Sequence, residues 1–270
     1  MHLSYYFLIF ASMSNLYLAS LNSGSNGNCY YVGNEHDAVL IDAGISCRET
    51  ERRMERLGLT LTSVRAILIS HDHTDHTRGV EVLSRKHRIP VYVTPATHIK
   101  SKLIIDPALV QPFTSHEALH FGSLTVSAFL KQHDAADPHS FTVTGKGITV
   151  GVFTDIGVAC EQLVHHFGQC HAAFLEANYD ETMLEQGRYP AFLKRRIRGG
   201  VGHLSNLQAL EVFKSYRAPF LNLLVLSHLS AQNNHPQIVS DLFNLHANGT
   251  RIAIASRFKE SEIFCIPEAS

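Results

Sequence analysis

Short apolar runs recur along the whole chain and predict β-strands, with helical patterns between and after them. The runs are rich in β-branched and aromatic residues and are bounded by turn residues. They cover 16–21, 29–33, 38–42, 64–70, 91–94, 124–130, 140–145, 148–155, 172–177, 221–227 and 251–256. Capping or amphipathic signals predict helices over 49–58, 79–87, 190–198, 205–216 and 236–249. Strands in mixed order with helices outside them predict an α/β fold of two packed sheets covered by helices, a four-layer αβ/βα sandwich.

No repeat, low-complexity tract or long linker divides the 270 residues, and a hydrophobic content of 45% can supply a large core. We therefore expect residues 13–270 to form a single domain. Residues 1–12 are expected to be an N-terminal extension of doubtful status. Their apolar stretch, 3–11, is too short to span a bilayer and has no Lys or Arg before it, so we expect no stable membrane association. A marginal signal peptide or tether stays open as the alternative.

Charge and cysteine content narrow the class of protein. The formal net charge of -1 excludes a globally basic nucleic-acid binder but leaves room for a local basic patch. The five cysteines are far apart and form no CxxC pair, which indicates neither a disulfide framework nor a cysteine-rich zinc knuckle. A reducing cytoplasm is the expected location. The 18 histidines are the unusual feature, because histidine is the commonest metal ligand.

The segment HDHTDH, from His71 to His76, follows the predicted strand 64–70. His71 and His73 are two positions apart and can point at one ion, while Asp75 and His76 can reach a second. The alternative is a polar loop with a helix N-cap, for which Thr74 or Asp75 would suffice. That alternative does not explain three histidines, so the spacing predicts a pair of metal sites.

HDHTDH resembles the HxHxDH signature of the metallo-β-lactamase superfamily, and four further elements of that family occur in order. They are Asp42 in LIDAG, His133 in LKQHDAADP, Asp155 in VFTDIG and His228 in LVLSHLS. The resemblance covers residues 16–256 and implies the metallo-β-lactamase fold.

The resemblance and the donor chemistry together predict two divalent ions. His71, His73 and His133 would hold one ion, Asp75, His76 and His228 the other, and Asp155 would bridge them. The mixed N/O set suits zinc, and manganese accepts it as well. Taken singly, His133 or His228 would more often be a capped or partly buried histidine. Asp42 is expected to orient a ligand histidine by accepting its other N–H, or else to be a turn residue before Gly44.

The chain more closely resembles the YycJ/WalJ/VicX-like branch, proposed DNA exonucleases, through segments 23–32, 133–138, 189–197, 202–206 and 228–234. This resemblance alone implies cleavage in the 5′ to 3′ direction. Tyr179 stands where some relatives carry a histidine, so no role of that histidine is transferred. GHLSN resembles the histidine motif of ribonuclease Z-type phosphodiesterases, which makes His203 the candidate general acid. The alternative is a plain helix start with Ser205 as N-cap.

Two segments are candidates for binding substrate phosphate. SGSNGN could turn backbone N–H groups toward an anion, or be an ordinary hairpin turn. KRRIR (194–198) could steer a phosphodiester backbone, or be a solvated helix face. The candidate substrate-binding residues are Ser23, Ser25, Asn26, Asn28, Lys194 and Arg195.

The expected function is a dinuclear-metal phosphodiesterase, a DNA exonuclease in which a metal-bridging hydroxide held by Asp75 and Asp155 attacks phosphorus. Asp75 and His203 are the expected catalytic residues. The alternatives are a glyoxalase II-like thioester hydrolase or another small-molecule metallo-hydrolase, and a metal-stabilised binding module. The strand-like C-terminus counts against the thioester hydrolase, which usually adds a helical region there. Oligomeric state stays open.

Overall fold

Two mixed sheets of seven strands each form the centre of the computed structural model, which describes residues 15–267. The extension expected over residues 1–12 lies outside the described residues. Within the described part of the chain, no helix has the length and apolar character needed to cross a bilayer.

The first sheet has the order β14-β1-β2-β3-β4-β5-β6. Its neighbours from β3 to β6 pair in parallel, and the other neighbours pair antiparallel. The strands are β1 (Asn15–Asn22), β2 (Cys29–Gly33), β3 (Ala38–Ile41), β4 (Val64–Leu68), β5 (Val91–Tyr92), β6 (Val110–Gln111) and β14 (Phe264–Pro267).

The second sheet has the order β13-β12-β11-β10-β9-β8-β7. Its strands from β10 to β13 are parallel, and those from β7 to β10 are antiparallel. The strands are β7 (Ala118–Phe121), β8 (Leu124–Leu130), β9 (His139–Gly145), β10 (Ile148–Phe153), β11 (Ala172–Glu176), β12 (Leu223–Ser227) and β13 (Arg251–Ile254).

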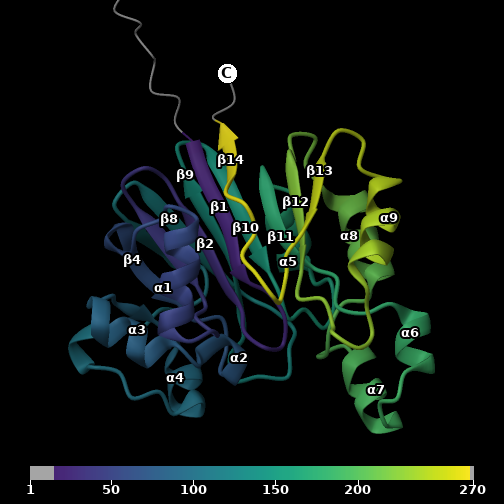
Figure 1. The fold of residues 1–270 in the computed structure, drawn as a ribbon, viewed down its shortest axis with the longest axis horizontal. Helices are drawn as coiled ribbons and strands as arrows, with labels where there is room; N and C mark the ends of the chain where they lie inside the picture. The colour runs from purple at the N-terminus through teal and green to yellow at the C-terminus, as the bar shows by residue number, and fades with distance from the viewer. Residues whose placement is uncertain (1–14, 268–270) are drawn as a thin grey trace, which may run out of the picture.

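Helices cover the outer face of each sheet (Figure 1). The helices α1 (Cys47–Arg56) and α3 (Val80–His87) lie on the first sheet, and α5 (Glu161–Phe167), α8 (Asn206–Tyr216) and α9 (Pro236–Asn244) lie on the second. Four short helices lie near the ends of the strands: α2 (Thr74–Thr77), α4 (Pro95–Ser101), α6 (Glu181–Gln186) and α7 (Ala191–Arg198).

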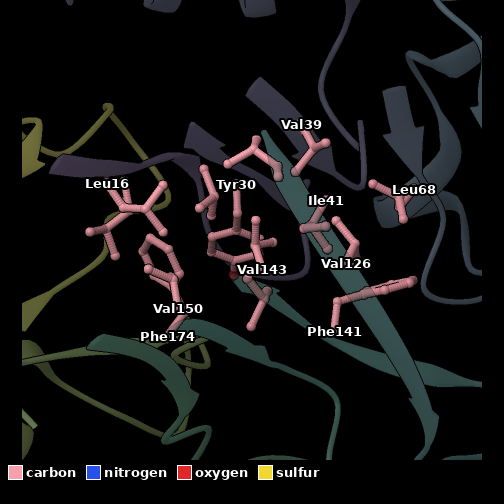
Figure 2. Close-up of a cluster of buried hydrophobic side chains, with 14 of the residues drawn as sticks. Leu16, Tyr30, Val39, Ile41, Leu68, Val126, Phe141, Val143, Val150 and Phe174 are labelled. Atoms are coloured by element: carbon pink, nitrogen blue, oxygen red, sulfur yellow. The ribbon is translucent and has the colours of Figure 1, made fainter. Parts of the chain in front are cut away.

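Alternation along the central strands builds the layers, because successive side chains of a strand point to opposite faces. In β11, Ala172 and Phe174 belong to the core between the sheets, whereas Ala173 and Leu175 belong to the core under the helices. Figure 2 shows the core between the sheets, where Tyr30 of the first sheet packs near Phe174 of the second. The predicted four-layer αβ/βα sandwich is therefore confirmed.

Most differences from the sequence prediction concern element ends and short elements. The helix expected over 236–249 ends at Asn244, and Asn248 adopts a φ of 44°, which an α-helix does not contain. The sequence prediction omitted α2, α4, α5 and α6 and the strands β6 and β7, which have two to seven residues each. Segments of this length carry too few periods for a hydrophobic pattern to be recognised.

Candidate metal centre

Strands of both sheets deliver ligand-type side chains to one edge of the sandwich. His71 comes shortly after β4 of the first sheet. Asp155 and His228 come directly after the parallel strands β10 and β12 of the second. The carboxyl ends of neighbouring parallel strands lie at the same sheet edge, and this edge is where α/β folds commonly bind ligands.

Three histidines form the first group. His71 Nε2 lies 3.1 Å from His73 Nδ1, and His133 Nε2 lies 3.4 Å from the same atom. One ligand atom from each lies within 4.8 Å of the other two, close enough for all three to bind one ion. His71 and His133 are buried, and His73 is partly exposed. The structure thus brings together the three histidines expected for the first site.

Asp75, His76 and His228 form the second group by the same measure. His76 Nε2 and His228 Nε2 lie 3.6 Å and 3.9 Å from Asp75 Oδ2. Asp155 lies between the groups, with Oδ2 3.1 Å from His76 Nε2 and Oδ1 3.9 Å from His133 Nε2. All seven expected ligands therefore lie close together, with Asp155 between the two groups.

Two atoms of this cluster are buried without a well-aligned hydrogen bond among residues 15–267: His228 Nε2, and Asp155 Oδ2, whose nearest donor-type atom is His76 Nε2 at 3.1 Å. Buried polar atoms are almost always partnered, so two such atoms within a cluster of histidines and carboxylates need an explanation. Divalent ions supply one, because imidazole nitrogen and carboxylate oxygen are ligands for zinc and manganese. The residues present fit such ions.

The pKa shifts in the cluster favour neutral imidazoles and an ionised carboxylate, which are the protonation states that bind cations. Burial lowers the pKa of His71 well below its usual range and that of His133 to about 4, so both imidazoles are neutral. Burial opposes the charge of Asp155, yet His228 and His76 hold the pKa of that carboxyl well below its usual value. His76 behaves oppositely: burial lowers its pKa, but Asp155 and Asp42 raise it well above the ordinary value. Metal binding there would displace a proton.

Asp42 lies behind His76 and is fully buried. His76 Nδ1 donates to Asp42 Oδ2 at 2.6 Å, while the backbone N–H and hydroxyl of Ser70 also donate to the Asp42 carboxylate, each at 2.8 Å. This arrangement leaves Nε2 of His76 as the ring nitrogen that faces Asp155. It is the geometry expected of a carboxylate that orients a ligand histidine. Asp42 also has a φ of 62°, so it makes the turn as well.

Glu176, at the end of β11, is a functional candidate that the sequence prediction missed. Its buried carboxylate accepts hydrogen bonds from His203 Nδ1 at 2.8 Å and His228 Nδ1 at 2.9 Å. The backbone N–H groups of Ile156 and Leu204 donate to its other oxygen. The sequence shows that Glu176 ends an apolar strand, but its partners follow only from the pairing of β11 with β10 and β12.

His203 lies beside the seven expected ligands and lines the cavity above them, which has a volume of ≈ 410 Å³. Burial lowers its pKa, but the Glu176 carboxylate outweighs burial and raises the pKa of His203 to about 9. Since Nδ1 donates to Glu176, Nε2 is the nitrogen left for a substrate. Ser205 caps α8 in a capping box with Gln208, so the helix start and the cavity-facing histidine coexist.

The four candidates in SGSNGN have different surroundings. Ser25 lines the cavity. Asn28 is buried and donates to Asp75 Oδ2 at 3.2 Å. Ser23 is buried, and its hydroxyl accepts the backbone N–H of His228 at 2.7 Å. Asn26 donates to the carbonyl of Arg257, away from the cavity. Ser23 and Asn28 therefore hold residues of the candidate metal centre in place, and Ser25 is the member of the segment that a substrate in the cavity can contact.

Helix α7 forms one wall of the cavity through Leu193, Arg196 and Ile197. Neither Lys194 nor Arg195 lines the cavity, and Lys194 Nζ donates to the carbonyl of Glu185. Arg196 lies at the cavity and donates to Asp134 Oδ2 at 2.5 Å. The helical period of α7 turns Arg196 toward the cavity, whereas the sequence prediction had chosen the two residues before it. Contact of Lys194 or Arg195 with a longer substrate stays a prediction.

The glycine of LIDAG is required by a close backbone approach. A Cβ atom at Gly44 would lie 1.6 Å from the carbonyl oxygen of Asp75, which also accepts the N–H of Asn28 at 2.7 Å. Only glycine leaves room for this contact. The turn after β3 thereby holds Asp75 in place.

Comparisons with known proteins agree with this geometry. A model of the family described as "Beta-lactamase superfamily domain" matches residues 37–229. The protein named exodeoxyribonuclease YycJ of Bacillus anthracis is 32% identical over 228 residues, which cover 83% of this chain and 86% of that protein. Exodeoxyribonuclease WalJ of Streptococcus pneumoniae serotype 2 (strain D39 / NCTC 7466) is 30% identical over 219 residues, covering 79% and 81% respectively.

The fold agrees with a solved structure as well. The crystal structure of Zn(2+)-bound PqqB from Methylobacterium extorquens has a TM-score of 0.71 and covers 93% of this chain and 99% of that chain, at 13% identity. This likeness shows the fold alone. Together with the sequence matches, it confirms the expected metallo-β-lactamase fold and metal-dependent hydrolase class. The chain belongs to the β-lactamase superfamily, in the branch of the YycJ and WalJ proteins.

Proposed function

We propose that the chain is a metal-dependent exonuclease that removes nucleotides from the 5′ end of DNA, with two divalent ions, zinc or manganese. The observation that carries the proposal is the convergence of seven ligand-type side chains, two of them with buried atoms that lack a well-aligned hydrogen bond, at a cavity that five of them line. Two relatives named exodeoxyribonucleases, matched over 86% and 81% of their lengths, supply the substrate class.

The seven expected ligands would hold the ions, and Asp42 and Glu176 would orient the ligand histidines through their Nδ1 atoms. Bound there, two divalent ions supply Lewis acidity and an activated water for attack on a phosphodiester. Asp75 is fixed by the side chain of Asn28 and faces the cavity, where it can orient the attacking water. Its position thus supports the catalytic role expected from the sequence.

His203 can protonate the departing oxygen from Nε2, because Glu176 holds the ring by Nδ1 and raises its pKa to about 9 in the metal-free protein. Arg196 also lines the cavity where a phosphodiester would lie, with its guanidinium paired to Asp134. Ser25 and the loop behind it offer polar groups on the same side.

The domain organisation and location are part of the proposal. We take residues 13–270 as one domain because the core between the sheets is built from side chains of both, among them Tyr30 and Phe174. All five cysteines are free, which fits the expected reducing cytoplasm.

The decisive experiment incubates the purified protein, loaded with zinc or manganese, with single- and double-stranded DNA labelled at the 5′ or the 3′ end. RNA and a thioester serve as competing substrates. Early release of a mononucleotide from 5′-labelled DNA is expected. Exclusive thioester hydrolysis would overturn the nuclease proposal in favour of the glyoxalase II-like alternative, and early release from the 3′ end would overturn the direction.

A pair of histidine variants controls this experiment. His73→Ala removes a proposed ligand from the first site, and its activity should be lost. His36→Ala removes an exposed histidine on the loop before β3, and activity should stay at the wild-type level. Undiminished activity in His73→Ala would remove the metal assignment.

A further inference from the structure

A second cavity, of ≈ 500 Å³, lies beside the cavity of the metal centre. Its walls come from residues 229–236 after β12, residues 254–258 at and after the end of β13, and Ser23. Ser230 lines both cavities, and Leu229, which follows the proposed ligand His228, lines the second. The volume is within the range of about 300–1,000 Å³ typical of small-ligand sites.

The wall of this cavity is mainly apolar. Leu229, Ile254 and Ala255 contribute to it, and Phe258 stands at the cavity with 83% of its surface exposed. In the free protein the exposed ring of Phe258 contributes little to stability, because most of its apolar surface stays in contact with water. Aromatic rings at such positions are used by single-strand-binding proteins as platforms for bases.

The cavity also contains an unsatisfied cationic group. Arg257 lines it, and Nη1 of Arg257 is buried without a hydrogen-bond partner among residues 15–267. A guanidinium stays charged at all physiological pH values and matches a phosphate group in geometry. The Arg257 carbonyl accepts from Asn26 Nδ2 at 2.9 Å, which ties this residue to the loop behind the metal centre.

Other polar groups of the cavity are already engaged within the protein. The Asn234 side chain donates to the carbonyl of Ala177 at 2.8 Å and accepts the N–H of His235 at 2.9 Å. The Ser256 hydroxyl accepts the N–H of Phe258 at 3.1 Å. These groups therefore offer little hydrogen bonding for reading the edge of a base.

We propose that this second cavity is a nucleotide subsite for the DNA strand cleaved at the metal centre, with a base stacked on Phe258 and a phosphate bound by Arg257. The proposal rests on the proposed function and names a part of the substrate that the metal centre itself does not contact. Because Ser230 lines both cavities, they lie close enough together for one strand to reach both. Because stacking tolerates any base, the subsite should accept all four bases with similar affinity.

The test compares oligonucleotide cleavage with hydrolysis of bis(p-nitrophenyl) phosphate, which has no base. For Phe258→Ala we expect the ratio of the two kcat/KM values to fall about tenfold, through KM for the oligonucleotide, as expected for loss of one stacked base. Arg257→Gln should lower the same ratio. Phe220→Ala, an exposed phenylalanine before β12, is the control and should leave both activities unchanged. A wild-type ratio in Phe258→Ala would overturn the subsite.

Direct binding separates failure of the subsite from failure of the proposed function. Anisotropy of a labelled single-stranded oligonucleotide can be measured with metal-free protein, whether or not any phosphodiester is cleaved. Weaker binding by about tenfold in Phe258→Ala, similar for oligo(dT) and oligo(dA), supports the subsite. Equal binding by wild type and Phe258→Ala overturns it, and so does binding that depends strongly on the base.

Discussion

Glu176 connects the proposed general acid with the proposed metal centre, since its Oε1 atom accepts from both His203 Nδ1 and His228 Nδ1. Its Oε2 atom accepts two backbone N–H groups, from Ile156 and Leu204. Replacement by glutamine keeps the shape of the side chain and removes its charge. If the amide oxygen keeps the two backbone N–H groups, the amide nitrogen must face two imidazole N–H donors.

These contacts give the expected loss of stability and of metal affinity in Glu176→Gln. Each imidazole loses a hydrogen bond to a charged group, worth about 1.5–3 kcal/mol, so the free energy of unfolding of the metal-free protein should fall by about 3–6 kcal/mol if neither ring changes tautomer. A ring that changes tautomer so that Nδ1 accepts carries its proton on Nε2, which blocks the proposed ligand atom of His228. Metal affinity should therefore fall about 10–100-fold, as for other residues that orient ligands.

Two assays on Glu176→Gln check these numbers. Competition with a chromophoric chelator gives the metal affinity, and urea unfolding of the metal-free protein gives the stability. Glu55→Gln, which changes an exposed glutamate of α1, is the matched control and should change neither quantity. Wild-type metal affinity in Glu176→Gln would refute the reasoning that Glu176 holds His228 in the ligand orientation.

The ion pair of Glu176 and His203 makes the stability of the metal-free protein depend on pH. Burial opposes both charges, but the histidines lower the pKa of Glu176 to about 2 and Glu176 raises that of His203 to about 9. Free Glu and His titrate near about 4.3 and 6.5. The contribution of Glu176 is therefore complete above about pH 4.3 and lost as pH falls toward about 2, and that of His203 is complete below about 6.5 and lost as pH rises through about 9. The stability difference between wild type and Glu176→Gln should be largest between about pH 4.3 and 6.5.

Three further predictions concern the backbone turn, the core and the metals. Gly44→Ala should destabilise the protein by about 1–3 kcal/mol or more and reduce its metal content, because the added Cβ would collide with the carbonyl of Asp75. Gly200→Ala is the control and should change little, because its Cβ would meet no described atom within 4 Å beyond its chain neighbours. Phe174→Ala should cost about 3–5 kcal/mol in urea unfolding and exposed Phe192→Ala almost nothing, and equal losses would contradict the assignment of the core. Chelation should lower the melting temperature of the loaded protein by an amount that grows with the initial free-metal concentration, and a melting temperature independent of metal would contradict binding to the folded state.

Local sequence patterns were enough to predict the fold class and the presence of metal sites. Short apolar runs bounded by turn residues predicted the strands, and their mixed order with helices outside predicted the two-sheet sandwich. β11 is apolar on both faces, because one face packs against the other sheet and the opposite face packs under helices. The HDHTDH segment predicted paired metal sites, because four of the seven proposed ligands lie within six residues. His133, Asp155 and His228 could be added from the family resemblance, although no local pattern shows that they meet.

Packing decided the features that sequence reasoning missed. Glu176 joins His203 to His228 only because β10, β11 and β12 lie side by side, and nothing near Glu176 in the sequence indicates those partners. The position of α7 against the cavity selects Arg196 over Lys194 and Arg195.

The sequence by itself determined the longer strands, the layered fold and the chemical kind of site, because these follow from apolar runs bounded by turn residues and from ligand-type residues close together in the chain. The tertiary structure alone decided which side chains complete the site and that a second cavity adjoins it at Ser230. The physical reason is that hydrogen-bond partners and cavity walls depend on how distant segments pack, and their distances in space are not encoded in any short stretch of residues.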